Sequence, residues 1–319
     1  QTEGFCLHDR DVIGITESLV ARAQGNYASI EDIAIDIKAK FRGDMAVVFP
    51  LLSRNRFAPV LKGIAMSGRK IYLFLSYPSD EMGNPLMDID TMDKAGLNPF
   101  TDVLTEDQYR KIFGDHVRHP FTGMDYVRLY KEQAVNDNID IYLTNDARVA
   151  LNYTKEILVA NVHERQRTKR MLKKAGALAV YSLDEVLNTP VNNSGYNPDF
   201  GLLGTNLATD NTIKLFPRDC QRIVNEVQAA IRDKTGKQAE VMIYGDGAFK
   251  DPQGKIWELA DPVVSPGYTK GLEGTPHEIK LKFIADNELC NLEHDKITVA
   301  MKNKIKEKKT GSMEAAASL

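Results

Sequence analysis

The chain has 319 residues, about twice the size of a usual single domain, so we expect two structural units or one unit with a large insertion. Hydrophobic residues make up 43% of the sequence and charged residues 27%, which is ordinary globular composition. The formal net charge of -3 predicts no general attraction to nucleic acid or to an anionic membrane surface.

The cysteines and the chain start indicate the compartment. Cys6, Cys220 and Cys290 are odd in number and far apart, which predicts neither a disulfide framework nor a zinc site. No apolar run reaches the roughly 18 residues of a membrane-spanning helix, and residues 1–11 lack the pattern of a signal peptide. We therefore expect a cytoplasmic protein without membrane or nucleic-acid partners.

The first elements alternate between strand and helix. Residues 12–15 predict a buried strand. The segment that follows this strand ends at Gly25, which can take a positive φ. Ser29 can cap a helix, with Asp32 three residues later as a variant of the capping box. The apolar residues of that helix recur at helical spacing: Ile30, Ile33, Ile37 and Phe41.

The middle of the chain predicts an α/β unit. Its continuous β-branched and aromatic runs are typical of strands covered on both faces, and they span residues 45–49, 71–75, 139–143, 157–161 and 178–181. A helix-like segment, 163–174, and Gly176 separate the last two runs, which is the rhythm of a βαβ unit. Residues 78–105 are rich in Pro, Gly, Asn and Asp and predict a long loop.

The C-terminal third resumes the alternation. Residues 220–234 predict a helix that stops at Gly236, and residues 239–244 predict the strand that follows. Residues 279–284 alternate apolar and basic side chains, as in a half-exposed strand, and a helical region opens at Asp286. The whole chain is therefore expected to be of mixed α/β class.

Carboxylates at strand ends and helix starts form one candidate site. Asp246, Asp286 and Glu288, with Asp210 and Asp261 as further members, could hold magnesium or manganese, because hard cations prefer oxygen ligands. The alternative is that these acidic residues are solvated helix caps.

The glycine-bearing loop after residue 244 is a second candidate. Gly245 and Gly247 would let backbone amides approach a phosphate, and Lys250 could supply the compensating charge. A plain tight turn is the alternative, since the usual nucleotide fingerprints are absent. The basic helix 163–174 could grip an anion, although its charges are more typical of a solvated face. His116 and His119 lie beside Pro120 and do not predict a zinc site.

Several segments, taken in chain order, resemble the coenzyme F-420:γ-glutamyl ligase family. Residues 11–25 resemble its opening strand and Ser-Lys-Ala-Glu-Gly stretch, and Asn206-Leu-Ala-Thr-Asp210 stands where the family has Asn-Ala-Gly-Ile-Asp. Residues 215–219 resemble its Leu-Leu-Pro-x-Asp segment. The strand 241–244 with Asp246 resembles its Asp-Thr-x-Gly-Arg site, and residues 284–289 resemble its Ala-Asp-Glu-Leu.

The resemblance implies an acid-amino-acid ligase that uses GTP and a divalent metal, magnesium or manganese. It implies that the γ-phosphoryl group activates a carboxylate of an acidic small molecule, which a glutamate amine then attacks. The metal ligands would be Asp210, Asp246, Asp286 and Glu288, the nucleotide would contact Arg22, Gly245 and Gly247, and Lys250 would offset charge on the transferred group. A homodimer is also implied.

This sequence departs from the family pattern at several positions. Ala21, Arg22 and Gln24 replace serine, lysine and glutamate, Gly247 replaces the threonine, and Lys250 replaces the arginine. The resemblance also divides the chain into a ligase-like core, residues 1–50 and 200–319, and an inserted α/β domain, residues 51–199.

Two other readings stay open on the sequence. The substituted motif positions favour a non-catalytic nucleotide- or metabolite-binding protein that keeps the fold. Alternatively, the chain is a different α/β enzyme with its site in the middle segment, where Asp80, Glu81 and Asp146 would be the carboxylates.

Overall fold

The computed structural model describes most of the chain, in two units. The described residues are 4, 6–80, 83, 85–119, 123–245, 248–250, 257–259, 263–273, 284, 289, 292 and 296–306, with the backbone alone for 248–250 and 257–259. Unit 1 comprises residues 1–13, 223–242 and 268–319, and unit 2 comprises residues 14–222 and 243–267. Helices and strands are mixed throughout, which confirms the predicted α/β class. The division into residues 1–50 with 200–319, and 51–199, stays a prediction.

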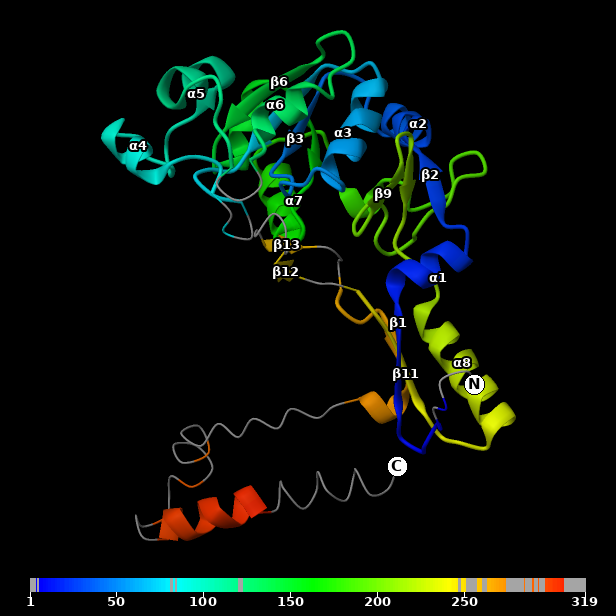
Figure 1. The fold of residues 1–319 in the computed structure, drawn as a ribbon. Coiled ribbons are helices and arrows are strands. Elements are labelled where there is room, and N and C mark those ends of the chain that lie inside the picture. Colours follow the sequence, from blue (N-terminus) through cyan, green and yellow to red (C-terminus); the bar gives the residue numbers. More distant parts are fainter. Residues whose placement is uncertain are drawn as a thin grey trace. The chain divides into compact units, whose positions relative to one another are not determined.

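A six-stranded sheet forms the centre of unit 2 (Figure 1). Its strand order is β5-β6-β4-β3-β7-β8, and all neighbours are parallel except β5, which runs antiparallel to β6. The bounds are β3 Met45–Val48, β4 Ile71–Leu75, β5 Leu104–Thr105, β6 Ile139–Leu143, β7 Glu156–Val159 and β8 Ala179–Ser182. The continuous apolar runs of the sequence therefore predicted the parallel strands correctly.

Helices cover both faces of this sheet, so alternate residues of each strand enter different cores. Met45 and Val47 of β3 belong to the larger core, which α2, α3 and α6 complete, whereas Ala46 and Val48 belong to a second core with α7 and η1. The bounds are α2 Ile30–Lys40, α3 Phe57–Met66, α6 Tyr126–Lys131, η1 Ala147–Asn152 and α7 Arg165–Lys174. At Gly63 of α3 a Cβ would lie 2.8 Å from the Cβ of Ile33, so glycine lets α3 approach α2 closely.

The segment after β4 contains more regular structure than the sequence predicts. The expected loop over residues 78–105 is wrong in part, because α4 spans Ile89–Lys94. The Asp88 side chain caps this helix by accepting the backbone N–H of Thr91 at 2.8 Å. Helix α5, Glu106–Phe113, follows with a complete capping box. The polar residues that indicated a loop thus act as helix caps.

The ends of unit 2 form a small sheet of order β2-β10-β9. Strand β1, Val12–Thr16, leads directly into α1, Glu17–Ala23, and then into β2, Tyr27–Ser29. Strands β9, Asn206–Thr209, and β10, Thr212–Lys214, form a hairpin whose second strand pairs with β2. The short helix η2, Leu183–Glu185, follows β8. Gly25 has φ +60°, as predicted.

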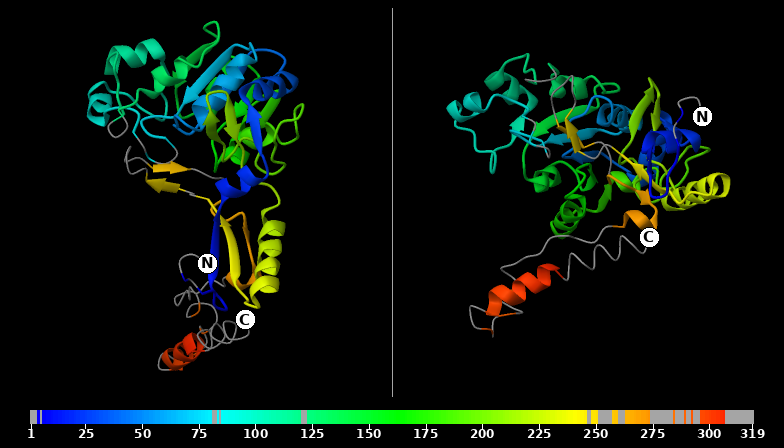
Figure 2. Two further views of the ribbon diagram at one scale, coloured as in Figure 1. Left: turned by 45° about the vertical axis from the view of Figure 1, so that its right-hand side comes forward. Right: turned by 60° about the horizontal axis from the view of Figure 1, so that its bottom comes forward.

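The remaining elements follow α8 along the chain. Helix α8, Cys220–Thr235, runs alongside β11, Glu240–Tyr244 (Figure 2), and Gln228 donates from α8 to the Ala239 carbonyl at 2.8 Å. The last three-stranded sheet has the order β1-β11-β14. The other bounds are β12 Ala248–Lys250, β13 Trp257–Leu259, β14 Gly267–Tyr268 and η3 Lys270–Leu272, and residues 296–306 are helical.

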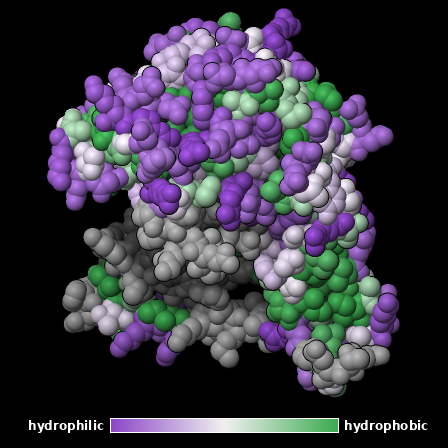
Figure 3. Space-filling view, turned by 45° about the horizontal axis from the view of Figure 1, so that its top comes forward, coloured by the Kyte–Doolittle hydropathy of each residue, from purple (hydrophilic) through white to green (hydrophobic). Residues whose placement is uncertain are grey.

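Hydrophilic residues dominate the upper part of the surface in Figure 3, as expected for a chain of ordinary globular composition. In the part of the chain that the structure describes, no helix combines the length and apolarity needed to cross a membrane. The predicted strand over residues 279–284 lies outside the described residues apart from Ile284.

Candidate functional site

A buried ion pair in unit 2 joins Glu17, in the segment 11–25 that resembles the ligase family, to Lys214, which lies between the two similar segments 206–210 and 215–219. Thr16 caps α1 by accepting the Leu19 N–H at 3.3 Å, which makes Glu17 the first residue of the helix. Lys214, the last residue of β10, donates to the two carboxylate oxygens of Glu17 at 2.8 and 3.0 Å. The Glu17 and Lys214 side chains are only 10% and 8% exposed. This pair therefore joins α1 to β10 inside the protein.

A second connection lies at the other end of α1. The side-chain amide of Gln24 donates to the Arg218 carbonyl at 2.6 Å and accepts the Arg218 N–H at 2.9 Å. The Arg218 guanidinium donates to Asn26 Oδ1 at 2.8 Å and lies 4.4 Å from the ring centroid of Tyr196, a cation–π contact. Residues 24–26 and 218 are thus held together by side-chain as well as backbone groups.

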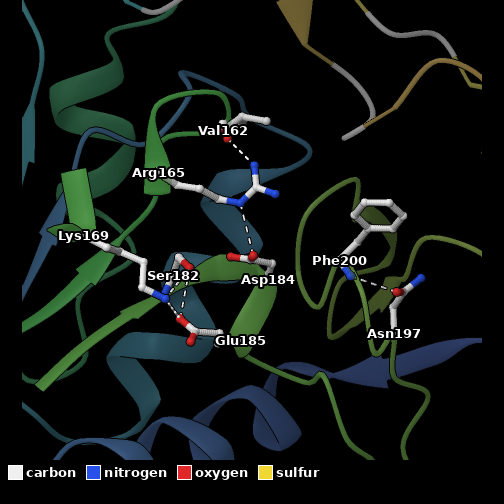
Figure 4. Close-up of polar contacts among 8 residues, drawn as sticks. All are labelled: Val162, Arg165, Lys169, Ser182, Asp184, Glu185, Asn197 and Phe200. Carbon is white, nitrogen blue, oxygen red and sulfur yellow. Dashed lines mark hydrogen bonds and ion pairs between the residues drawn. The ribbon is translucent and has the colours of Figure 1, made fainter. Parts of the chain in front are cut away.

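Two buried asparagines fix the segment between β10 and α8. Asn26 and Asn197 are 0% and 1% exposed, and each donates from its side-chain amide to the Phe216 carbonyl, at 2.8 and 3.0 Å. Asn197 also donates to the Pro217 carbonyl at 3.1 Å and accepts the Phe200 N–H at 2.9 Å (Figure 4). Because buried backbone groups need hydrogen-bond partners, these asparagines determine the path of residues 215–219.

Two of the predicted ligand-binding residues lie on α1 and on the β9–β10 hairpin. Arg22 lies in the last turn of α1 and is exposed. Asp210 is exposed in the turn between β9 and β10. Both side chains are exposed, and the Glu17–Lys214 pair joins the helix and the hairpin that bear them.

The other predicted site residues lie near β11 and beyond. Gly245 follows β11, and its N–H donates to the Val264 carbonyl at 2.7 Å. The backbone of Lys250 pairs with that of Trp257 in the β12–β13 ladder. The Lys250 side chain and the residues Asp246, Gly247, Asp261, Asp286 and Glu288 lie outside the described residues. Among the side chains described, no cluster of three or more His, Cys, Asp or Glu residues could hold a metal. The predicted metal and nucleotide sets therefore stay predictions.

The rival site in the middle segment includes Asp146, whose contacts are structural. Asp146 caps η1 by accepting the Arg148 N–H at 2.9 Å and forms an ion pair with Arg148 at 2.7 Å. The side-chain hydrogen bond from Arg148 lowers the pKa of Asp146 below its ordinary value despite partial burial. Glu81 lies outside the described residues.

The charged side chains of the basic helix α7 differ in their exposure. Arg167, Arg170, Lys173 and Lys174 are exposed, as a solvated face predicts. Lys169 is buried, however, and its ammonium group bonds to Ser182 and Glu185 (Figure 4). The prediction of a solvated face is therefore wrong for Lys169, because this lysine ties α7 to the end of β8.

The sequence patterns do not identify four buried polar residues of this region: Glu17, Lys214, Asn26 and Asn197. One signal was present for Lys214, which stands between the apolar residues Ile213 and Leu215 in a short strand. A buried lysine in such a run needs an acidic or hydrogen-bonding partner, but the local sequence does not show which residue that is.

A comparison with models of protein families places the chain in a known family. The model of the family described as F420-0:Gamma-glutamyl ligase matches residues 1–311, which is nearly the whole chain and includes the six-stranded sheet of unit 2. None of the curated proteins matches the chain, and neither does any solved structure.

Proposed function

The chain belongs to the F420-0:gamma-glutamyl ligase family, and we propose on this basis that it forms an amide bond between the amino group of glutamate and a carboxyl group of an acidic small molecule. The observation that carries the proposal is the length of the match, residues 1–311. Because the match includes residues 51–199, we propose that the ligase consists of the core together with the embedded α/β unit.

The proposed reaction uses GTP and has two steps. A carboxylate oxygen of the acceptor attacks the γ-phosphorus of GTP, which forms an acyl phosphate and releases GDP. The neutral amine of glutamate then attacks the acyl carbon, phosphate leaves, and the nitrogen loses its proton to form the amide. Both steps require negative charge on the phosphoryl group to be offset.

The residues proposed for this chemistry are those that the family resemblance implies. Asp210, Asp246, Asp286 and Glu288 would hold magnesium or manganese, for which carboxylate oxygens are suitable ligands. Bound there, the cation would stabilise charge on the phosphates. Arg22, Gly245 and Gly247 would bind the nucleotide, and Lys250 would lie against the transferred phosphoryl group.

The contacts of unit 2 support this assignment for the two members that the structure describes with their side chains. The buried Glu17–Lys214 pair joins α1, which bears Arg22, to the hairpin that bears Asp210. Catalytic groups need such support, because small displacements of a positioned group lower the rate strongly.

The test measures phosphate release from GTP with glutamate, the acceptor F420-0 and manganese, together with the mass of the product. We expect release only when all components are present. Asp246→Asn and Asp286→Asn should lower the rate by about 10²–10³-fold, as for the loss of a group that stabilises transition-state charge. Asp233→Asn, at an exposed position of α8, is the matched control.

Two results would contradict the proposal. Phosphate release without glutamate would contradict the proposed ligation to glutamate. Unchanged GTP binding in Asp246→Asn would contradict the proposed place of the metal and nucleotide site. Binding of GTP and manganese without turnover across a panel of amino acids would instead favour the non-catalytic protein, which the replaced residues at Ala21, Gln24 and Gly247 also suggest. We further propose that the protein is cytoplasmic and forms a homodimer. Light scattering on the purified protein measures its mass and so tests the homodimer.

A further inference from the structure

Arg218 is a partly exposed arginine whose charge has no acidic partner among the residues that the structure describes. Its Nη1 donates to two neutral acceptors, Asn26 Oδ1 at 2.8 Å and the Tyr196 carbonyl at 3.0 Å. The carboxylate of the next residue, Asp219, lies 3.9 Å from Arg222 instead. A charge that is partly removed from water without a counter-charge is costly, so an anionic ligand at Arg218 would relieve that cost.

Two nitrogens of this guanidinium are left for a ligand. Nε and Nη2 of Arg218 donate to no residue that the structure describes, and neither is a fully buried atom. These two nitrogens form one edge of the planar group, and that edge matches the two oxygens of a carboxylate. Arg69 differs, because its Nη1 and Nη2 both donate to carbonyls of residues 41 and 42 and its Nε is buried. Arg69 therefore has only a structural role, whereas Arg218 keeps a binding edge.

The surroundings of Arg218 hold it in one orientation. Gln24 bonds to both backbone groups of Arg218, at 2.6 and 2.9 Å. The ring centroid of Tyr196 lies 4.4 Å from the guanidinium carbon, and the Tyr196 N–H donates to Asn26 Oδ1 at 3.0 Å. The two residues that contact the guanidinium are thus bonded to each other. A binding group that is fixed before the ligand arrives loses less entropy on binding.

The position of Arg218 in the sequence indicates a role in specificity. Arg218 stands at position x of the segment that resembles Leu-Leu-Pro-x-Asp, which that pattern leaves open. Gln24 stands where the family pattern has glutamate. A carboxylate there cannot donate to the Arg218 carbonyl, and it would bring a negative charge next to Arg218. The neutral glutamine therefore leaves the charge of Arg218 available to a ligand.

The proposed ligation needs such a group. The amine of glutamate forms the amide, so both of its carboxylates stay unreacted and negatively charged while glutamate is bound. The residues proposed above bind the metal or the nucleotide or lie against the phosphoryl group, and none of them is directed at these carboxylates. Gln24, which holds Arg218, is two residues from Arg22 on the chain, so Arg218 belongs to the same part of unit 2 as a proposed nucleotide contact.

We propose that Arg218 binds a carboxylate of the incoming glutamate through Nε and Nη2. Arg218 would thereby make the protein prefer an acidic amino acid over a neutral one. This inference rests on the proposed ligase function, and it adds a substrate-binding residue that the family resemblance does not supply.

NMR on the full chain tests the contact without catalysis. The Nε–H signal of Arg218 is identified by its loss in Arg218→Lys. With magnesium and a non-hydrolysable GTP analogue present, L-glutamate should shift this signal until the site is saturated, whereas glutamate dimethyl ester, which has no free carboxylate, should not. A shift in a protein that shows no ligation would refute the ligase function and keep the binding site. Ligation by a protein that shows no shift would overturn the present proposal.

Steady-state kinetics provide the second measurement. Arg218→Gln should raise the KM for glutamate about 10–100-fold through the loss of charged hydrogen bonds. It should leave kcat and the KM for GTP nearly unchanged, because the carboxylate is bound alike before and during the reaction. Arg218→Lys keeps the charge without the planar edge and should recover part of the loss. Arg232→Gln, at an exposed position of α8, is the matched control.

Glutamine as the amine substrate shows which carboxylate is bound. An equal effect of Arg218→Gln on glutamate and glutamine assigns the α-carboxylate, and an effect on glutamate alone assigns the side-chain carboxylate. Circular dichroism checks the fold of each variant, and the NMR measurement on the parent protein stays decisive if Arg218→Gln does not fold. An unchanged KM for glutamate in folded Arg218→Gln would overturn the proposal. A fall in kcat with a parallel rise in the KM for GTP would do so too, because a merely structural role predicts that result.

Discussion

The buried ion pair between Glu17 and Lys214 makes a strong prediction about stability. Replacement of Lys214 with methionine keeps most of the side-chain volume and removes the charge, which leaves the Glu17 carboxylate buried. At the observed N–O distance of 2.8 Å, the attraction between the two charges is about 6 kcal/mol for an effective dielectric constant of roughly 20. The cost of desolvating both charges opposes this attraction, so the pair as a whole stabilises the fold by less.

The loss of one partner is more costly than the loss of both. Removal of one member of a buried pair typically destabilises by about 3–5 kcal/mol, because the other charge stays without compensation. We expect this loss for Lys214→Met, with a fall in Tm of about 6–20 °C for a unit of this size. The double variant Glu17→Gln, Lys214→Met buries no charge, so it should be more stable than the sum of the single variants predicts.

Urea unfolding followed by far-UV circular dichroism measures these differences. The matched control is Lys38→Met, at an exposed position of α2, which should change the free energy of unfolding by no more than about 0.5 kcal/mol. If Lys214→Met behaves like the control, or if the two single changes simply add in the double variant, Glu17 and Lys214 do not form an energetically coupled buried pair.

Two further predictions concern ionisable groups. Burial raises the pKa of Glu185, but hydrogen bonds from Lys169 and Ser182 outweigh it and hold this pKa below its ordinary value. The ionised Glu185 therefore stabilises the folded state fully above the unfolded pKa of about 4.3, and this stabilisation is lost as the pH falls below that value. In urea unfolding at acid pH, the difference in free energy of unfolding between the parent and Glu185→Gln should shrink. Burial raises the pKa of Cys220 to about 11. Iodoacetamide at about pH 8 should therefore alkylate the exposed Cys6 before Cys220, and peptide mass spectrometry measures both rates. Faster labelling of Cys220 would contradict its burial.

The sequence by itself determined the local elements and the family. Continuous apolar runs predicted the strands of the parallel sheet, because a strand covered on both faces has no polar side to show. The helix after Ser29 was also readable, since its capping box lies within four residues of sequence. The family was recognised from the order of several short segments along the chain, and the family match over residues 1–311 confirms the family.

Only the tertiary structure decided which distant residues meet. Glu17 and Lys214 are 197 positions apart, and nothing in the pattern around either residue identifies the other. The strand order is likewise invisible in the sequence, because every parallel strand has the same apolar signature whichever neighbours it takes. Local patterns predict elements through short-range contacts, whereas a site requires long-range contacts that folding alone brings together.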